Sequence, residues 1–116
     1  MAAGRQPTDA VDRYVAKLTR QATTGDDMAR RGLSLARMYF QVQDLESAKR
    51  HLLRYLGFDN RNHSAQKLMG YIYEKLGNMG HALYHYEMSL KLQTQRDVAV
   101  KVAQLYCSQP PKDLIV

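Results

Sequence analysis

Apolar and small residues recur at helical spacing in residues 63–96, in two stretches with a turn between them. In the first stretch Met69 and Tyr73 stand four apart and share a helix face, while Gly70 leaves room for a close neighbour. The second stretch has an apolar or small residue at every fourth position, at Ala82, Tyr86 and Leu90. The Gly-Asn pair at 77–78 is typical of a turn. The pattern predicts two antiparallel helices packed against each other.

The same pattern occurs one unit earlier and begins again one unit later. The corresponding positions of the earlier unit are, in order, Leu35, Ala36, Tyr39, Ala48, Leu52 and Leu56. Those of the later unit are Val102, Ala103 and Tyr106. A period of about 34 residues, with a large-small pair, an aromatic residue soon after it and a small residue in the second helix, is the tetratricopeptide (TPR) pattern. Gln66 and Thr94 stand where that pattern usually has Trp and Pro.

The predicted fold class is all-α, with antiparallel helix pairs stacked as a short right-handed solenoid of the TPR type behind an N-terminal capping helix. We divide the chain into a flexible lead-in 1–8, a TPR-like helical domain 9–109 and a tail 110–116. Within the domain we expect the capping helix at 9–22, repeat one at 29–62, repeat two at 63–95 and partial repeat three at 96–109.

Capping residues place several helix ends. Thr8 or Asp9 is expected to cap the first helix, and Asp44 is expected to cap the helix Leu45–Leu56. Between these two helices the sequence predicts one continuous helix from Asp26 to about Gln43, with acidic residues in its first turn.

The third repeat is incomplete in this sequence. Pro110 and Pro111 stop the last helix, and only residues 112–116 remain for a second one. We therefore expect a fragment or a truncated form of a longer array, whose open last face self-associates weakly or binds a partner. The terminal residues 113–116 could alternatively act as a PDZ ligand, although a cut end explains them more simply.

Composition adds a basic excess. The net charge is +6, and residues 1–62 carry eleven Lys and Arg against seven acids, which favours anionic partners. No apolar run is long enough to cross a membrane and no signal-peptide pattern follows Met1, so we expect a soluble intracellular protein without membrane insertion. The single Cys107 cannot form an internal disulfide, and we expect it to be a small buried residue.

Catalytic and metal-binding patterns are weak. His81 and His85 stand four apart, a spacing that can hold zinc, but no cysteine or carboxylate motif accompanies them. The sequence shows no nucleophile beside a base, no carboxylate pair in a substrate context and no glycine-rich phosphate loop. We therefore expect no metal, no cofactor and no enzymatic activity.

Four stretches together resemble a known family: residues 11–16, 35–56, 69–74 and 97–105. They are similar to the N-terminal TPR domain of the family of the large Ran-binding nucleoporin, and the similarity runs from Asp9 to Cys107. The resemblance implies a component of the nuclear pore complex in the cytoplasmic filaments, at the cytoplasmic face of the nuclear envelope. It also implies a role in transporting mRNA and protein, docking on other nuclear pore proteins, and weak non-specific affinity for single-stranded RNA. The family's Ran-binding modules, zinc fingers and SUMO-ligase segment lie in other parts of a far longer chain, so the resemblance carries none of their activities.

One candidate surface is the concave groove. In a TPR array the first helix of each repeat lines this groove, and the candidates here are Arg30, Arg37, Phe40, Lys67, Tyr71 and Lys101, accompanied by Leu33, Ser64 and Glu74. The sequence predicts a basic groove with one or two exposed aromatic rings. A chaperone-type peptide clamp is disfavoured, because it needs Asn side chains beside its Lys and no groove position here is Asn.

A second candidate surface is basic and lies on the capping helix and on the second helix of repeat one. Its members are Arg13, Lys17, Arg20, Lys49, Arg50 and Arg54. Such residues can hold RNA phosphates while bases stack on an exposed ring such as Tyr71, which gives sequence-tolerant, salt-sensitive binding. The same residues also fit an ordinary solvated helix face. The alternative function is a generic TPR adaptor outside the pore that binds a peptide or a partner helix in its groove.

Overall fold

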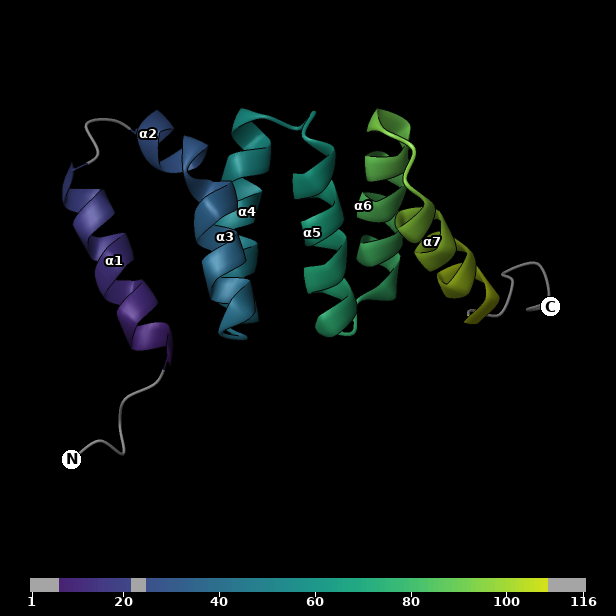
Figure 1. Ribbon diagram of the computed structural model, residues 1–116, viewed down its shortest axis with the longest axis horizontal. Coiled ribbons are helices and arrows are strands. Elements are labelled where there is room, and N and C mark those ends of the chain that lie inside the picture. Colours follow the sequence, from purple (N-terminus) through teal and green to yellow (C-terminus); the bar gives the residue numbers. More distant parts are fainter. Residues whose placement is uncertain (1–6, 22–24, 109–116) are drawn as a thin grey trace. The chain divides into compact units, whose positions relative to one another are not determined.

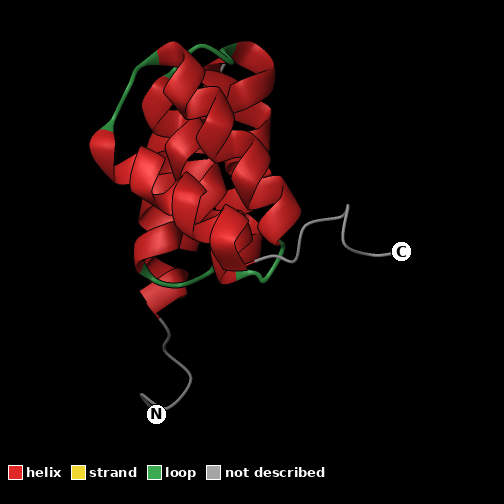
Figure 2. Cartoon of the chain, turned by 90° about the vertical axis from the view of Figure 1, so that its right-hand side faces the viewer, coloured by secondary structure: helices red, strands yellow, loops and turns green. Residues whose placement is uncertain are grey.

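Helices make up the chain in the computed structural model, which describes residues 7–21 and 25–108. In order they are α1 (Pro7–Gln21), α2 (Gly25–Arg30), α3 (Gly32–Gln41), α4 (Leu45–Phe58), α5 (His63–Lys75), α6 (Met79–Leu92) and α7 (Arg96–Ser108) (Figure 1). The described ranges contain no strand (Figure 2), so the predicted all-α class is confirmed. The chain divides between Asn60 and Arg61 into two compact units, called unit 1 and unit 2 below.

The predicted start of the first helix differs from the structure. Helix α1 begins at Pro7, so Thr8 and Asp9 stand within its first turn and past its N-cap position. Proline suits this place because its fixed φ matches the helix and its missing N–H would have no partner there. The first six residues of the predicted lead-in and the predicted tail 110–116 lie outside the described residues.

Unit 1 is built on the helix pair α3 and α4. The buried residues that face each other across this pair are Leu35, Ala36 and Tyr39 on α3 and Ala48, Leu52 and Tyr55 on α4. Helix α1 packs against α3, and α2 packs against both α3 and α4. The residues predicted from the repeat period therefore form most of the core of this pair.

The helix predicted from Asp26 to Gln43 is in fact two helices. It breaks at Arg31, whose ψ of −4° departs from helical geometry, and α3 starts at Gly32. Glycine is a poor helix former, and here it lies against α4, where an added Cβ would come within 2.5 Å of the His51 carbonyl oxygen. The close approach of α4 therefore favours glycine at position 32. The periodicity of the sequence did not predict the helix break next to it.

The junction between α3 and α4 was predicted in part. The Asp44 side chain accepts a hydrogen bond from the Ser47 backbone N–H at 3.2 Å, which confirms Asp44 as the N-cap of α4. The residue before it, Gln43, has a φ of 63°, a left-handed conformation that is uncommon for a side chain of this kind. The chain thus reverses direction at a residue that sequence reasoning placed in the helix.

Unit 2 contains the pair α5 and α6, with α7 packed against α6. Asn62 caps α5 and Asn78 caps α6, each through its side-chain oxygen. In the core, Tyr86 and Val98 are fully buried and belong to one cluster with Ala82 and Leu105. The turn predicted at 77–78 and the burial predicted for Ala82 and Tyr86 are both confirmed.

Cys107 was predicted to be buried, and this prediction is wrong because the residue is exposed. Helix α7 turns its Val98 and Leu105 side toward the core of unit 2. Two residues along a helix correspond to a rotation of about 200°. Cys107 therefore lies on the opposite side of α7 from Leu105.

Replacing Gly70 with alanine is predicted to destabilise unit 2. A Cβ at this position would lie 2.5 Å from two carbons of the Tyr86 ring, and that ring is fully buried. We expect Gly70→Ala to lower the free energy of unfolding by about 1–3 kcal/mol, measured by urea denaturation followed by circular dichroism. Gly57→Ala is the matched control, because nothing lies within 4 Å of its added Cβ, and it should change stability by less than about 1 kcal/mol. Equal stability of the two variants would contradict this packing.

Candidate interaction surfaces

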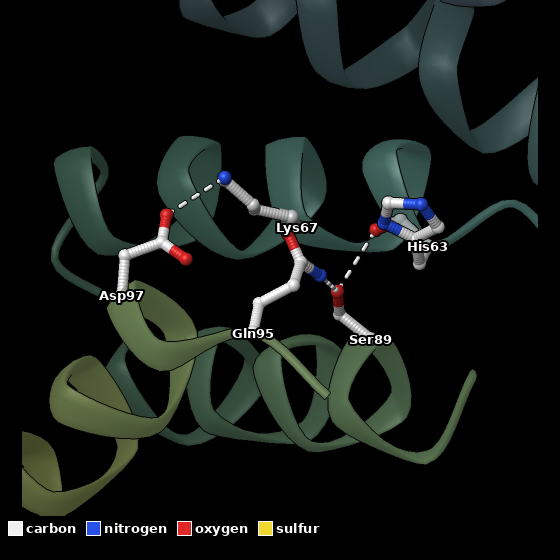
Figure 3. A network of polar contacts seen from close by, with 5 residues as sticks. All are labelled: His63, Lys67, Ser89, Gln95 and Asp97. Carbon is white, nitrogen blue, oxygen red and sulfur yellow. Dashed lines mark hydrogen bonds and ion pairs between the residues drawn. The ribbon is translucent and has the colours of Figure 1, made fainter. Parts of the chain in front are cut away.

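The two groove lysines of unit 2 are both held by carboxylates. The Lys67 ammonium lies 2.8 Å from Asp97 Oδ2 (Figure 3), and the Lys101 ammonium lies 3.0 Å from Glu74 Oε2. Each pair joins α5 to α7. These two positions therefore carry balanced charge, because α7 brings one acid and one base against α5.

Tyr71, predicted to be an exposed ring for base stacking, is only half exposed. It packs edge-on against the Tyr86 ring with the two ring centroids 5.6 Å apart. The Lys67 ammonium lies 6.0 Å from the centroid of the Tyr71 ring. Tyr84 is the more open ring, at 58% exposure. Tyr71 therefore offers part of one ring face and Tyr84 offers more.

Glu74 has the most constrained carboxylate of unit 2. It accepts hydrogen bonds from the Tyr86 hydroxyl at 2.6 Å and from Lys101. Burial alone would raise the pKa of Glu74, but these two hydrogen bonds together with the positive charges of Lys101 and Lys75 hold the pKa below its usual value. Burial, followed by the hydrogen bond to Glu74, raises the pKa of the Tyr86 hydroxyl, so the tyrosine stays a neutral donor. The arrangement is structural, since all its hydrogen-bonding groups are engaged with one another.

A second polar network fastens the ends of the helices in unit 2 (Figure 3). The Ser89 hydroxyl donates to the His63 backbone carbonyl at 2.9 Å, and Gln95 Nε2 donates to the Ser89 oxygen at 3.1 Å. Ser89 is fully buried, so these bonds satisfy a hydroxyl that would otherwise be costly to bury. This network was missed from the sequence, where a serine in an apolar helix face gave no signal.

The groove residues of unit 1 remain more available. Arg30 pairs with Asp27 at 3.7 Å and lies 5.5 Å from the centroid of the Phe58 ring. Arg37 is exposed and Phe40 is half buried. At the predicted groove positions of unit 1, Arg37 on α3 is thus an exposed cation, whereas Arg30 on α2 has an acidic partner.

The predicted basic surface divides into two stripes in unit 1. Arg13, Lys17 and Arg20 are exposed along α1, and Arg50 and Arg54 are exposed along α4. Lys49 is partly neutralised by Glu46, 3.2 Å away. Helix α3 packs against both α1 and α4 (Figure 1). The two basic stripes therefore lie on separate helices and do not merge into one continuous patch.

A histidine is buried within the α4 stripe. His51 is 7% exposed, and its ring stacks on Tyr39 with centroids 5.4 Å apart and planes 7° from parallel. Burial lowers the pKa of His51, and the positive charges of Arg50 and Arg54 lower it further. The histidine therefore belongs to the core, while its two arginine neighbours provide the exposed charge.

His81 and His85, which have a zinc-like spacing, are engaged in other contacts. His85 Nδ1 lies 2.8 Å from Gln66 Oε1, and its ring stacks on Tyr73 at 5.5 Å; burial, followed by the nearby His81, lowers the pKa of His85 to about 4. His81 Nδ1 lies 2.9 Å from the Asn78 side chain. The described residues contain no group of three or more metal-ligating side chains.

Comparison with known proteins identifies the family. The model of the C-terminal ARM domain of tetratricopeptide repeat protein 21 matches residues 2–107. The chain belongs to this helical-repeat family. It is also 27% identical over 104 residues to the human E3 SUMO-protein ligase RanBP2, which covers 89% of this chain and 3% of that protein. The resemblance to the Ran-binding nucleoporin family is thereby confirmed.

Other relatives carry RanBP2-like names. Human RANBP2-like and GRIP domain-containing protein 8 is 28% identical over 104 residues, covering 89% of this chain and 6% of the relative. Human RANBP2-like and GRIP domain-containing protein 1 is 31% identical over 84 residues, covering 72% and 5%. The chain thus spans only a small part of the length of these relatives. Among the described helices, none has the length and apolar character needed to cross a membrane.

The Glu74 contacts predict a pH-dependent stability. Because the folded-state pKa of Glu74 lies below its usual 4.5, the stabilisation is present above about pH 4.5 and is lost as the pH falls through the lower folded value. We expect the free energies of unfolding of the wild type and Glu74→Gln to differ most near neutral pH and to converge as the pH falls below the usual pKa of Glu74, in urea titrations at several pH values. Glu46→Gln is the control, since that carboxylate is exposed beside Lys49 and should matter little at any pH. A Glu74→Gln difference that stays constant with pH would rule out the ionised contact.

Proposed function

We propose that the chain is a non-enzymatic helical-repeat interaction module of a nuclear pore component. It docks on other pore proteins at the cytoplasmic face of the nuclear envelope and serves the transport of mRNA and protein. The observation that carries the proposal is the similarity to RanBP2 along 89% of the chain, which extends the resemblance to the Ran-binding nucleoporin family. A generic adaptor role outside the pore is the alternative.

The absence of catalysis is part of the proposal. The strongly bonded ionisable groups of unit 2, Glu74 with Lys101 and Asp97 with Lys67, hold helices together and are not placed to attack a substrate. The exposed charged residues of unit 1 lie on helix surfaces. Such a distribution suits binding through surfaces.

We also propose weak binding of single-stranded RNA through unit 1. The supporting observation is the exposed pair Arg50 and Arg54 on α4, whose positive charges add to burial in lowering the pKa of the neighbouring His51. Exposed cations of this kind contact phosphates, and the stripe on α1 adds three more. The paired lysines of unit 2 contribute little in this proposal.

Reversing the α4 charges is predicted to weaken RNA binding. In fluorescence anisotropy with a short unstructured RNA, we expect the logarithm of the wild-type affinity to fall linearly with the logarithm of the salt concentration, with a slope of about 0.7 for each phosphate neutralised. The double variant Arg50→Glu with Arg54→Glu loses two phosphate contacts, so its total slope should be smaller by about 1.4. Lys75→Glu with Lys91→Glu changes the net charge equally on exposed residues of unit 2 and is the matched control. Equal losses in both double variants, or no loss in the first, would exclude this surface.

Localisation separates the pore role from the adaptor role. We expect the fluorescently tagged protein to give a rim around the nucleus, because docking on pore proteins would concentrate it there. Fluorescence microscopy at low expression, with the tag alone as control, makes the measurement. A diffuse cytoplasmic signal without a rim would favour the generic adaptor over the pore module.

A further inference from the structure

A cavity of about 320 Å³ lies between α1 and α3 in unit 1. Its lining residues are Tyr14 and Leu18 on α1, Arg31 just before α3, and Ser34, Leu35 and Met38 along α3. Leu35 is 1% exposed and forms the apolar base, while Tyr14 is 45% exposed at the rim. The volume lies at the lower end of the range found for ligand sites, which begins at roughly 300 Å³.

Contacts on both sides fix the two helices around this cavity. At one end the Tyr39 hydroxyl donates to Asp12 Oδ1 at 2.6 Å. Toward the other end of α1, the Thr19 hydroxyl donates to the Val15 carbonyl and lies 3.9 Å from the sulfur of Met28 on α2. Val11 on α1 is buried, at 7% exposure. The cavity is therefore formed before any ligand arrives, which reduces the ordering cost of binding.

This cavity is distinct from the concave groove predicted from the repeat pattern. The groove residues on this part of the chain are Arg30, Arg37 and Phe40, and none of them lines the cavity. Arg37 directly precedes Met38, so the two side chains point about 100° apart around the helix. The cavity thus occupies the side of α3 that faces α1.

The lining combines an apolar base with an unused cation. The side chains of Arg31 and Ser34 make no hydrogen bond or ion pair with another described residue, and the lining set contains no carboxylate. Two acids whose side chains the structure describes in unit 1 are engaged elsewhere, since Asp12 accepts from Tyr39 and Asp27 pairs with Arg30. A guanidinium binds a carboxylate through two parallel hydrogen bonds. Charge complementarity therefore calls for a ligand that carries an apolar group next to a carboxylate.

We propose that this cavity is a docking site for a short segment of a partner protein in which a large apolar residue adjoins Asp or Glu. The apolar side chain sits on Leu18, Leu35 and Met38, and the carboxylate binds Arg31 with Ser34 as a further donor. Exposed Lys17 and Arg37, each one residue away from the lining, make the surroundings positive and attract acidic segments. The inference deepens the proposed function, on which it rests, by naming a second docking site and the chemistry of its partner.

The test uses a fluorescein-labelled, end-blocked peptide of sequence Ser-Gly-Glu-Leu-Phe-Glu-Gly-Ser, whose binding to the full chain is followed by fluorescence anisotropy. We expect the wild type to bind and Arg31→Glu to weaken binding about tenfold or more, since a charge-assisted contact is lost and a repulsive one added. Ser34→Tyr should weaken it similarly by filling the cavity. Both positions are exposed, so the variants should retain the wild-type melting curve.

Two controls separate the site from general electrostatics. Arg37→Glu makes the same charge change on the same helix outside the cavity and should alter affinity less than about threefold, and a peptide with both Glu replaced by Gln should bind more weakly than the original. Equal losses for Arg31→Glu and Arg37→Glu would overturn the proposal. Failure of the peptide to bind the wild type would also overturn it. Laurate, a small molecule with an apolar chain and a carboxylate, is tested in parallel: if laurate binds in an Arg31-dependent way and the peptide does not, the cavity is not a docking site for a protein segment.

Peptide binding and nuclear-rim localisation together distinguish this inference from the proposed function. If the tagged protein forms a nuclear rim but the peptide does not bind, the docking site is wrong and the pore role stands. If the peptide binds in an Arg31-dependent way but no rim appears, the site stands and the pore role fails.

Discussion

The fit of the Tyr86 ring against Gly70 sets the geometry of unit 2. The ring occupies the space that a Cβ on residue 70 would need, and this brings α5 and α6 into close contact. Its hydroxyl reaches Glu74 on α5, and Glu74 in turn holds Lys101 on α7. A single buried aromatic residue therefore fixes both the spacing of the helix pair and the carboxylate that binds the third helix.

The sequence repeat extends to an aromatic stack that we did not predict. Tyr39 stacks on His51 in unit 1, and Tyr73 stacks on His85 in unit 2, with centroids 5.4 and 5.5 Å apart. Both members of the second pair stand one repeat period after those of the first. The signal is present in the sequence, but His51 lies among basic residues and His85 stands four residues after His81, which drew attention to charge and to metal spacing instead. Applying the period to polar residues as well as apolar ones would have found it.

The two stacks differ in one polar contact, and the repeat explains the difference. His85 Nδ1 is bonded to Gln66, but the position one repeat period before Gln66 is Gly32. His51 Nδ1 is buried and finds no hydrogen-bond partner within the described part of the chain. Gly32 has no side chain that could bond His51, and the His51 carbonyl and Tyr55 of α4 instead pack closely against its backbone. Unit 1 thus gains close backbone packing, whereas unit 2 gains a satisfied histidine.

Most helix positions, the Asp44 cap and the buried faces of the two complete helix pairs followed from periodicity and capping, because those signals are local. The period fails in α7, where Ala103 and Tyr106 are exposed and Val98 and Leu105 are buried. The break at Arg31, the exposure of Cys107 and the state of the groove lysines did not, because each depends on residues distant in sequence. Lys67 and Lys101 counted as free cations in the sequence, yet their partners Asp97 and Glu74 stand 30 and 27 residues away. Their pairing shifts the uncompensated positive charge toward unit 1, where the basic excess of residues 1–62 is carried on exposed helix faces. An anionic partner drawn by charge would therefore meet unit 1 first, and the cavity beside Arg31 lies in that unit.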